Sequence, residues 1–359
     1  MKAYLKELMY YILAGLIVWY CIILITDGVH IKQGIIDSIK ACMNIIIPSL
    51  FAFMAASGII VSSGLYSFIS KPFSLFSRFI IGMPSSLFSI FLISNIAGYP
   101  VGAKLICDMY DNNNINKKTA QVMQCFCFGA GPAFVGSAVG LELFGSVKIG
   151  MIVFLSCVIS NLALAAVMCR LFKLKVIQNN TNLHFDSAIL TDSVLSAGKS
   201  LVSVCTLIVF FSTLITTLEH YGIIGSICRR VGLNGSEGLL RSVLDITNLA
   251  RMHSAAYSLI PVIAGICSLG GICVIIQIKA LTASRYSLKL FVLTRPIVCA
   301  LSVVNSFWLL KIMLPDSLET AACKNGIFVK VNNFVPSVCL ILMIFLLKIK
   351  KRVAFSKRV

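Results

Sequence analysis

Charged residues are scarce in this 359-residue sequence, and acidic residues are the scarcest of them. Charged side chains make up 12% of the chain, whereas they form about a quarter of an ordinary soluble domain, and 58% of the residues are hydrophobic. This balance excludes a soluble globular protein. The composition instead predicts an all-α polytopic membrane protein in contact with the lipid bilayer.

The sequence also lacks the motifs of common enzymes and metal proteins. It has no phosphate-binding loop, no dinucleotide fingerprint and no H-E-x-x-H zinc motif. The 14 cysteines are scattered singly, and the closest pair, Cys125 and Cys127, does not have zinc-site spacing. We therefore expect no enzyme activity, no cofactor and no metal, and we expect the cysteines to be small apolar side chains in a reduced compartment.

Basic residues outnumber acidic ones by 31 to 13, which gives a net charge of +18. They form short clusters between apolar segments, and no basic stripe alternates with aromatic residues, so we expect no nucleic-acid partner. The clusters follow the positive-inside rule when both termini lie in the cytoplasm. The basic residues at 229–241 are the exception.

Apolar segments of about 20 residues, the length of a spanning helix, recur along the chain. The first lacks a small-residue cleavage site and therefore predicts a retained span rather than a signal peptide. Two stretches, 84–109 and 238–257, are shorter or interrupted, and we expect them to be re-entrant hairpins. The eight predicted spans are 10–26, 41–62, 119–142, 147–171, 195–218, 258–281, 288–312 and 334–348.

The same order of parts occurs in both halves of the chain. A hairpin with Ser-Asn-Ile-Ala at 94–97 corresponds to one with Thr-Asn-Leu-Ala at 247–250. Three spans in each half predict copies of opposite orientation, which is the architecture of secondary transporters. The predicted divisions are an N-terminal helix (1–34), a first repeat (35–172), a cytoplasmic linker (173–192), an inverted second repeat (193–313) and a C-terminal helix with a basic tail (314–359).

The first hairpin, "SNIAGYPVGAKL" at 94–105, holds helix-breaking residues and a charge beside an apolar run. At its tip, the second arm would begin with unpaired N–H groups and the positive end of a helix dipole, which favours an anion. The alternative is a Gly/Pro turn whose lysine reaches to the membrane surface. The predicted substrate-binding residues here are Ser94, Asn95, Gly98, Pro100, Gly102 and Lys104.

The corresponding tip of the second half, at 245–255, has Asn248 in the place of Asn95. Arg251 and His253 follow it, and two basic groups near a second tip strengthen the prediction of an anion site. The alternative is an interfacial loop with a solvated arginine. We include Asn248, Arg251 and His253 among the predicted substrate-binding residues.

Glycines and a proline interrupt the predicted span at 119–142. Freed backbone is tolerated at membrane depth only against protein or water, so we expect Gly129, Gly131 and Pro132 to line a substrate cavity. Gly136 and Gly140 form a G-x-x-x-G pattern, which is typical of close helix packing.

Arg295 lies beside Pro296 in the middle of the predicted span at 288–312. We expect it to contact substrate; the alternative is an arginine paired with a neighbouring carboxylate or carbonyl. A proton or sodium site usually needs an intramembrane carboxylate or converging carbonyls. The acidic residues considered for such a site, Glu142, Glu219 and Asp245, lie near predicted span ends. Positive groups therefore favour a small organic anion as cargo.

Three segments resemble a known family: "IPSLFAF" at 47–53, "AGYPVGAKL" at 97–105 and "GPAFVGSAVG" at 131–140. They look like segments of the YlbJ (SpoVV) family of sporulation integral membrane proteins, which carries nucleoside-recognition Gate domains. The resemblance implies a fold similar to concentrative nucleoside transporters, the outer forespore membrane as location, and a role in moving dipicolinic acid, a flat dianion. Ala52 and the apolar stretch 128–131 depart from the family pattern.

The residues thus predict a transporter of a small organic anion, and the resemblance implies dipicolinate as that anion and endospore formation as its setting. One alternative is a nucleoside or other metabolite carrier of the same fold. Another is a non-transporting scaffold of the sporulation membrane, in which the hairpin tips serve packing. Besides the anion and the bilayer, the expected partners are a second copy of the chain or other sporulation membrane proteins.

Overall fold

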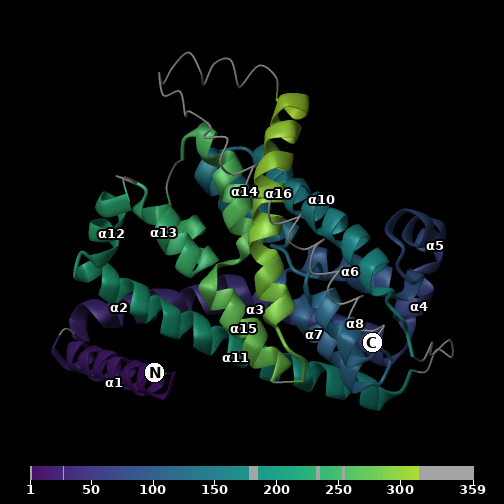
Figure 1. Cartoon of the computed structure of the whole chain (residues 1–359), viewed down its shortest axis with the longest axis horizontal. Helices are drawn as coiled ribbons and strands as arrows, with labels where there is room; N and C mark the ends of the chain where they lie inside the picture. The colour runs from purple at the N-terminus through teal and green to yellow at the C-terminus, as the bar shows by residue number, and fades with distance from the viewer. Residues whose placement is uncertain are drawn as a thin grey trace.

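The computed structural model describes residues 2–26, 28–177, 185–231, 235–252, 255–283 and 285–314. Within these ranges the chain is helical (Figure 1), and the one β-bridge found there joins Ile115 and Val176. The predicted all-helical class is confirmed. His253, the predicted span at 334–348 and most of the C-terminal division lie outside the described residues.

Among the described residues, five helical segments are long and apolar enough to cross a membrane. A sixth is obtained if Lys71–Ile81 and Ser85–Ala97 are counted as one span, although they are bent by 97°. The predicted spans at 41–62 and 119–142 coincide with shorter apolar helices, so about five membrane-length helices are confirmed within the described ranges and the count of eight is not confirmed. The five segments are Glu7–Thr26, Val147–Phe172, Ser187–His220, Tyr257–Thr282 and Lys289–Met313.

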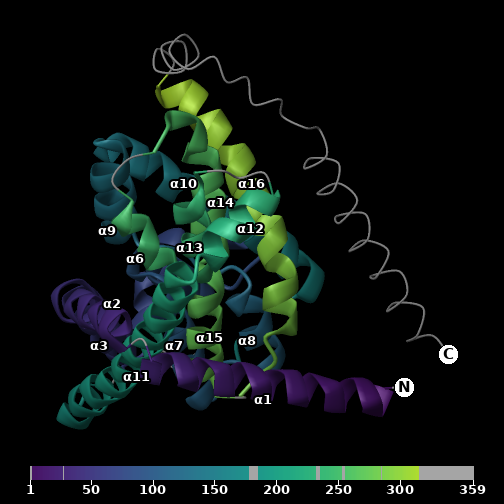
Figure 2. The ribbon, with the colours of Figure 1, turned by 90° about the vertical axis from the view of Figure 1, so that its left-hand side faces the viewer.

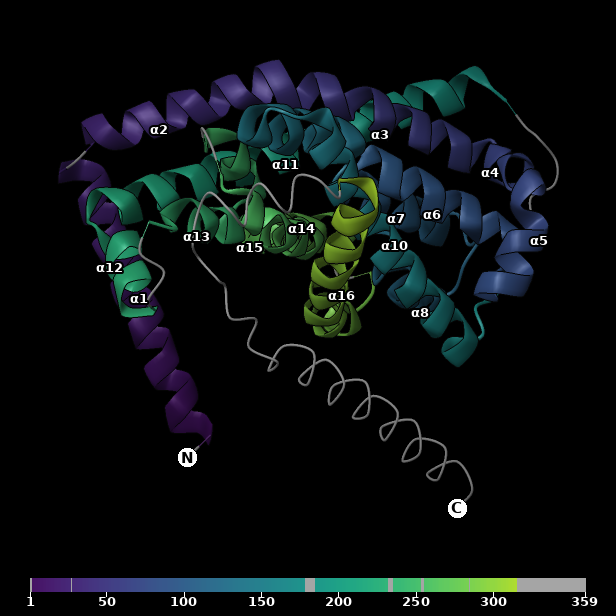
Figure 3. The ribbon, with the colours of Figure 1, turned by 90° about the horizontal axis from the view of Figure 1, so that it is seen from above.

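The N-terminal helices lie at the edge of the molecule, as Figure 2 and Figure 3 show for α1. In α1, apolar side chains such as Tyr11 and Ile25 are exposed, as expected for a helix in contact with lipid. The first helices and turns are α1 (Lys2–Thr26), α2 (Gly28–Ala41), η1 (Cys42–Ile46), α3 (Ile47–Ser62), α4 (Leu65–Ile69), η2 (Lys71–Phe73), α5 (Ser74–Phe76) and η3 (Ser77–Ile81).

The first predicted hairpin is present as α6 (Ser85–Ala97) and α7 (Tyr99–Asp111), which pack against each other. They meet at Gly98, whose φ of 98° is a backbone conformation that glycine adopts without steric cost. Pro100 lies in the first turn of α7, where a proline leaves no helical hydrogen bond unmade. The tip predicted from these two residues is therefore present.

The first half of the chain also contains a broken helix. After α8 (Lys117–Gln124), residues 125–131 are irregular, and the helix resumes as α9 (Pro132–Phe134) and η4 (Val135–Leu143). The span α10 (Val147–Phe172) then packs closely on η4. A Cβ atom on Gly150 of α10 would lie 3.0 Å from the Cα atoms of Gly136 and Gly140. The predicted packing role of these two glycines is confirmed.

The second half begins with the 34-residue helix α11 and ends with α16, which packs against both α10 and α14. Figure 1 shows α14 and α16 near the centre, with α10 beside them. Gly270 and Gly271 have φ values of 80° and 77° and break the helix between α14 and α15. The elements are α11 (Ser187–His220), α12 (Ile223–Val231), α13 (Glu237–Leu244), η5 (Ile246–Arg251), η6 (Tyr257–Leu259), α14 (Ile260–Leu269), α15 (Gly271–Thr282) and α16 (Lys289–Met313).

Candidate functional site

The tip of the first hairpin lies directly on the irregular segment 125–131. A Cβ atom on Gly102 would come within 2.5 Å of the carbonyl oxygen of Cys127, so the two backbones touch at this point. A Cβ atom on Gly131 would lie 3.1 Å from the carbonyl oxygen of Ile96 and 3.6 Å from the Cα atom of Gly98. The structure thus brings the predicted glycines of both segments together. Because these residues lack a side chain, the two backbones can touch.

An amide pair joins the hairpin to α10 at the same place. Asn95 is 3% exposed, and the side-chain amide of Asn161 donates to its Oδ1 at 2.8 Å and to the carbonyl of Phe128 at 2.7 Å. In a continuous helix that carbonyl would bond to the amide of residue 132, which is Pro132 and has no N–H. Asn161 therefore supplies the missing donor.

Asn161 was not among the predicted site residues. Its Oδ1 is buried and has no hydrogen-bond partner among the residues that the structure describes, so the amide presents an unused acceptor next to the break. The sequence did contain a feature that could have identified it, because Asn161 is a lone asparagine inside the apolar span 147–171. Gly129 lies between the two amides: its Cβ would be 3.2 Å from Oδ1 of Asn95 and 3.3 Å from Nδ2 of Asn161.

Two other predicted residues of the hairpin have local roles. Ser94 is fully buried, and its hydroxyl donates to the carbonyl of Phe91 at 2.8 Å within α6. Lys104 is 4% exposed, and its ammonium group lies 2.8 Å and 3.0 Å from the carboxylate oxygens of Asp108. It also donates to the hydroxyl of Ser196 on α11 at 3.0 Å.

Asp108 was missing from the acidic residues considered in the sequence. It lies four residues after Lys104, which places the two side chains on one face of a helix. The charge of Lys104 is therefore balanced inside the protein. Burial of this lysine does not by itself require an anionic ligand.

The turn that corresponds to the hairpin tip in the second half is built around an acidic residue. The carboxylate of Asp245, 2% exposed, accepts from the amide of Thr247 at 3.1 Å and from its hydroxyl at 2.9 Å. The buried side-chain amide of Asn248 donates to the carbonyl of Asp245 at 3.0 Å. Arg251, at the end of η5, is exposed. The structure therefore places Asn248 in a buried turn and leaves Arg251 outside it.

The break between α14 and α15 meets the first hairpin and its irregular segment. Tyr99, the first residue of α7, donates its hydroxyl to the carbonyl of Cys267 at 2.5 Å. A Cβ atom on Gly270 would overlap the ring of Phe128. A Cβ atom on Gly271 would lie 3.2 Å from the carbonyl of Val243, at the end of α13. We call this junction of residues 125–131 with residues 267–271 the central crossing.

Arg295 is buried at the central crossing, with 1% of its side chain exposed. Its guanidinium donates to the carbonyl of Cys125 on one side and to that of Ser268, at 3.4 Å, on the other. The rings of Phe128 and Phe291 lie beside it, with centroids 4.7 Å and 4.9 Å from the guanidinium carbon. Arg295 thus bridges the two broken helices, and the alternative of pairing with carbonyls is observed.

No carboxylate within the described ranges lies at ion-pair distance from Arg295, and its Nε has no hydrogen-bond partner. Carbonyls at the end of α14 carry the negative end of a helix dipole and offset part of the charge. Aromatic faces add a further, smaller contribution. A formal positive charge nevertheless remains in a region without water-facing surface, where burial of an unpaired charge is costly. Such a centre is suited to an anion.

These features define an all-helical integral membrane protein in which two broken helices meet at a buried arginine. Over 125 residues, 35% of this chain, the sequence is 25% identical to the sporulation integral membrane protein YlbJ of Bacillus subtilis (strain 168). The chain covers 31% of the length of that relative. No family model matches the chain, and no solved structure matches it. The similarity and the apolar helices support an integral membrane protein.

Proposed function

We propose that this chain is a transporter that moves a small organic anion across a membrane during endospore formation, with dipicolinate as cargo. The observation that carries the proposal is Arg295, a buried cation that touches carbonyls and aromatic rings and has no acidic partner among the described residues. An anion is the simplest group to complete such a centre.

The proposal assigns cargo recognition to the central crossing. Arg295 binds a carboxylate of the cargo, and the buried rings of Phe128 and Phe291 beside it keep water away from this contact. The unused Oδ1 of Asn161 can accept a hydrogen bond from a water molecule bound beside the cargo. Lys104 is left out of the cargo contacts because Asp108 already neutralises it.

The proposal also includes an inverted repeat that works by alternating access. Its eight spans, its two re-entrant hairpins and its likeness to concentrative nucleoside transporters are part of the proposal. Two observations support it: each half has a glycine-marked break, and each break contacts a turn of its own half, at Gly131 and at Gly271. Broken helices that meet at a polar centre are a recurring feature of secondary transporters.

The cellular setting in this proposal is the outer forespore membrane, with both termini in the cytoplasm. The chain would act as a carrier and not as an enzyme, alone or with a second copy or other sporulation membrane proteins. The name of the Bacillus subtilis relative supports the sporulation setting.

A carrier for nucleosides is the second candidate, and the amide pair favours it. Asn95 and Asn161 are buried neutral groups of the kind that recognise uncharged polar ligands, and one of their oxygens is unused. In this case Arg295 would serve mainly to hold the broken helices together.

Uptake into proteoliposomes tests the proposal directly. The purified full chain is reconstituted, and the uptake of labelled dipicolinate is measured with unlabelled dipicolinate or nucleosides as competitors. We expect Arg295→Gln to lower uptake at least ~10-fold, because a hydrogen bond to a charged group contributes about 1.5–3 kcal/mol. The matched control is Arg251→Gln, which removes the same charge from an exposed position and should leave uptake within about two-fold.

Each outcome has a clear meaning. Uptake that unlabelled dipicolinate competes for, and that depends on Arg295, supports the proposal. Competition by nucleosides alone favours the second candidate. If the folded wild-type chain takes up neither compound, the transporter proposal is wrong, and a scaffold of the sporulation membrane becomes the better account.

A further inference from the structure

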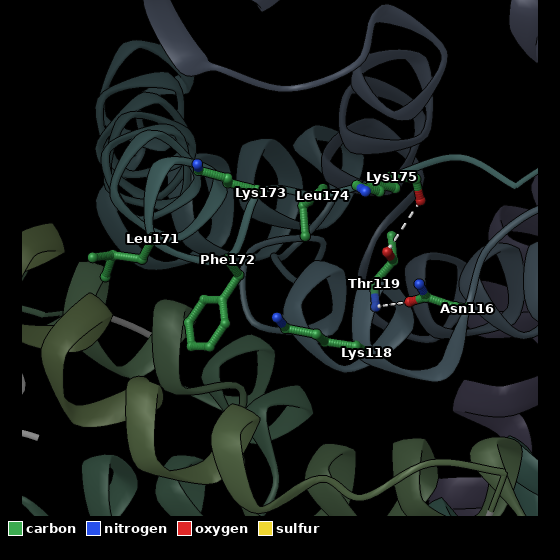
Figure 4. Close-up of a pocket in the computed structure, with 8 residues that line it drawn as sticks. All are labelled: Asn116, Lys118, Thr119, Leu171, Phe172, Lys173, Leu174 and Lys175. Carbon is green, nitrogen blue, oxygen red and sulfur yellow. Dashed lines mark hydrogen bonds between the residues drawn. The ribbon is translucent and has the colours of Figure 1, made fainter. Parts of the chain in front are cut away.

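A cavity of about 330 Å³ lies where α10 ends and α8 begins. Figure 4 shows that its walls come from the start of α8 and from the segment that leaves α10. None of its lining residues belongs to the central crossing. We call it the lysine pocket; it is lined by Asn116, Lys118, Thr119, Leu171, Phe172, Lys173, Leu174 and Lys175.

Hydrogen bonds between distant parts of the chain hold the walls of the lysine pocket in place. The Thr119 hydroxyl donates to the carbonyl of Lys175 at 3.2 Å, and the amide of Ile177 donates to the carbonyl of Asn114 at 2.9 Å. The Asn116 side chain accepts from the amide of Thr119 at 2.8 Å, which caps α8 (Figure 4). The pocket therefore has defined walls on both sides.

The backbone conformation of Lys173 adds to the positive charge at the pocket. Lys173 follows the last residue of α10 with φ of 47°, a left-handed conformation that glycine or asparagine usually occupies at the end of a helix. A lysine pays a steric cost there that glycine does not. Lys173 therefore occupies a strained backbone conformation, and its side chain places a positive charge at the rim of the pocket.

Three lysines and no acidic residue line the pocket. Within the described part of the chain, Lys118, Lys173 and Lys175 have no carboxylate partner. The ammonium group of Lys118 lies 5.6 Å from the ring centre of Phe172, beside which Figure 4 draws it. Three like charges around one cavity give it a positive electrostatic potential that attracts an anion.

The position of the pocket limits the kind of anion. Phe172 is the last residue of the apolar span Val147–Phe172, so the pocket lies at the depth where lipid headgroups meet the protein. Basic pockets at the ends of spanning helices recognise phosphate-bearing headgroups. We propose that the lysine pocket binds a phosphate group, carried by an anionic lipid headgroup or by a soluble phosphate.

Binding to the purified full chain in detergent tests this proposal. Three probes are titrated by native mass spectrometry and thermal shift: dihexanoyl phosphatidic acid, inorganic phosphate and zwitterionic dihexanoyl phosphatidylcholine. The test variant replaces the three lysines of the pocket with glutamine. The control variant makes the same change at three exposed lysines outside it, Lys117, Lys279 and Lys289.

We expect saturable binding of phosphatidic acid or inorganic phosphate to the wild type and to the control variant. The test variant should bind the same probe at least ~10-fold more weakly, because each basic residue adds to the attraction of an anionic headgroup. The stronger of these two probes identifies the source of the phosphate. Because all the exchanged lysines are exposed, both variants should keep the melting temperature of the ligand-free wild type.

Two results would overturn the proposal. One is equal affinity of the test and control variants for both phosphate probes. The other is equal affinity of the wild type for phosphatidylcholine and phosphatidic acid together with no binding of inorganic phosphate. Dipicolinate uptake does not enter either result, so the proposal stands or falls separately from transport.

Discussion

Two nearly fully buried cations, Lys104 and Arg295, occupy different electrostatic surroundings. Lys104 on α7 has Asp108 one helical turn away, at 2.8 Å, and a serine hydroxyl at 3.0 Å. Arg295 on α16 has two carbonyls and two aromatic rings. The charge of Lys104 is balanced by Asp108, whereas Arg295 has no acidic partner in the described part of the chain. Burial alone therefore does not identify a binding charge, and the proposed role of Arg295 depends on its lack of a counter-ion among the described residues.

Removing the acid from the first pair would make Lys104 resemble Arg295. We expect Asp108→Asn to lower the free energy of unfolding by about 3 kcal/mol, because breaking a buried ion pair leaves an uncompensated charge. Breaking a buried ion pair costs about 3–5 kcal/mol, and we take the low end of this range because Asp108 is 20% exposed. Thermal and denaturant unfolding of the purified chain in detergent measure the effect.

The control for that change is the double variant Lys104→Met with Asp108→Leu. Replacing both partners with apolar groups removes the pair without leaving a charge, so its stability should stay near that of the wild type. A double variant as unstable as Asp108→Asn would mean that the pair is needed for its hydrogen bonds and not for charge balance.

Giving Arg295 an acid would make it resemble Lys104. Cys299 lies four residues after Arg295 on α16, the same spacing as in the first pair. We expect Cys299→Asp to reduce dipicolinate uptake about ten-fold, because the new carboxylate competes with the anion for the guanidinium. Cys299→Asn has the same shape without the charge, and uptake by it that matched the Asp variant would contradict this account.

A neutral donor sharpens the comparison further. Asn161 satisfies a freed carbonyl, that of Phe128, as Arg295 does for Cys125, but without a charge. We expect Asn161→Ala to destabilise the chain by about 1–2 kcal/mol, since it leaves that carbonyl and Asn95 without their donor. Equilibrium unfolding measures this, and Asn305→Ala on α16, which removes a single bond to Ser160, should cost less.

The sequence predicted features that depend on local backbone chemistry. Gly98 and Pro100 predicted the hairpin tip because each residue restricts or frees its own backbone angles. Gly136 and Gly140 predicted close packing because small residues at this spacing admit a neighbouring helix. The all-helical class followed from composition, because a long apolar segment in lipid makes all its backbone hydrogen bonds within itself when it is a helix.

Features that depend on distant contacts were not predicted. Asn161 acts on a carbonyl 33 residues away in the chain, and Tyr99 reaches the carbonyl of Cys267 in the other half. Hydropathy also did not predict the short helices within 41–62 and 119–142, because it measures the length of an apolar segment and not where the helix bends or unwinds.

Calorimetric binding of dipicolinate to the purified chain tests the central claim most directly. The comparison is between wild type, Arg295→Gln and the double variant Lys104→Met with Asp108→Leu. The account predicts that the double variant binds like the wild type and that Arg295→Gln binds at least ~10-fold more weakly. Wild-type affinity in Arg295→Gln would contradict the claim that this arginine holds the anion.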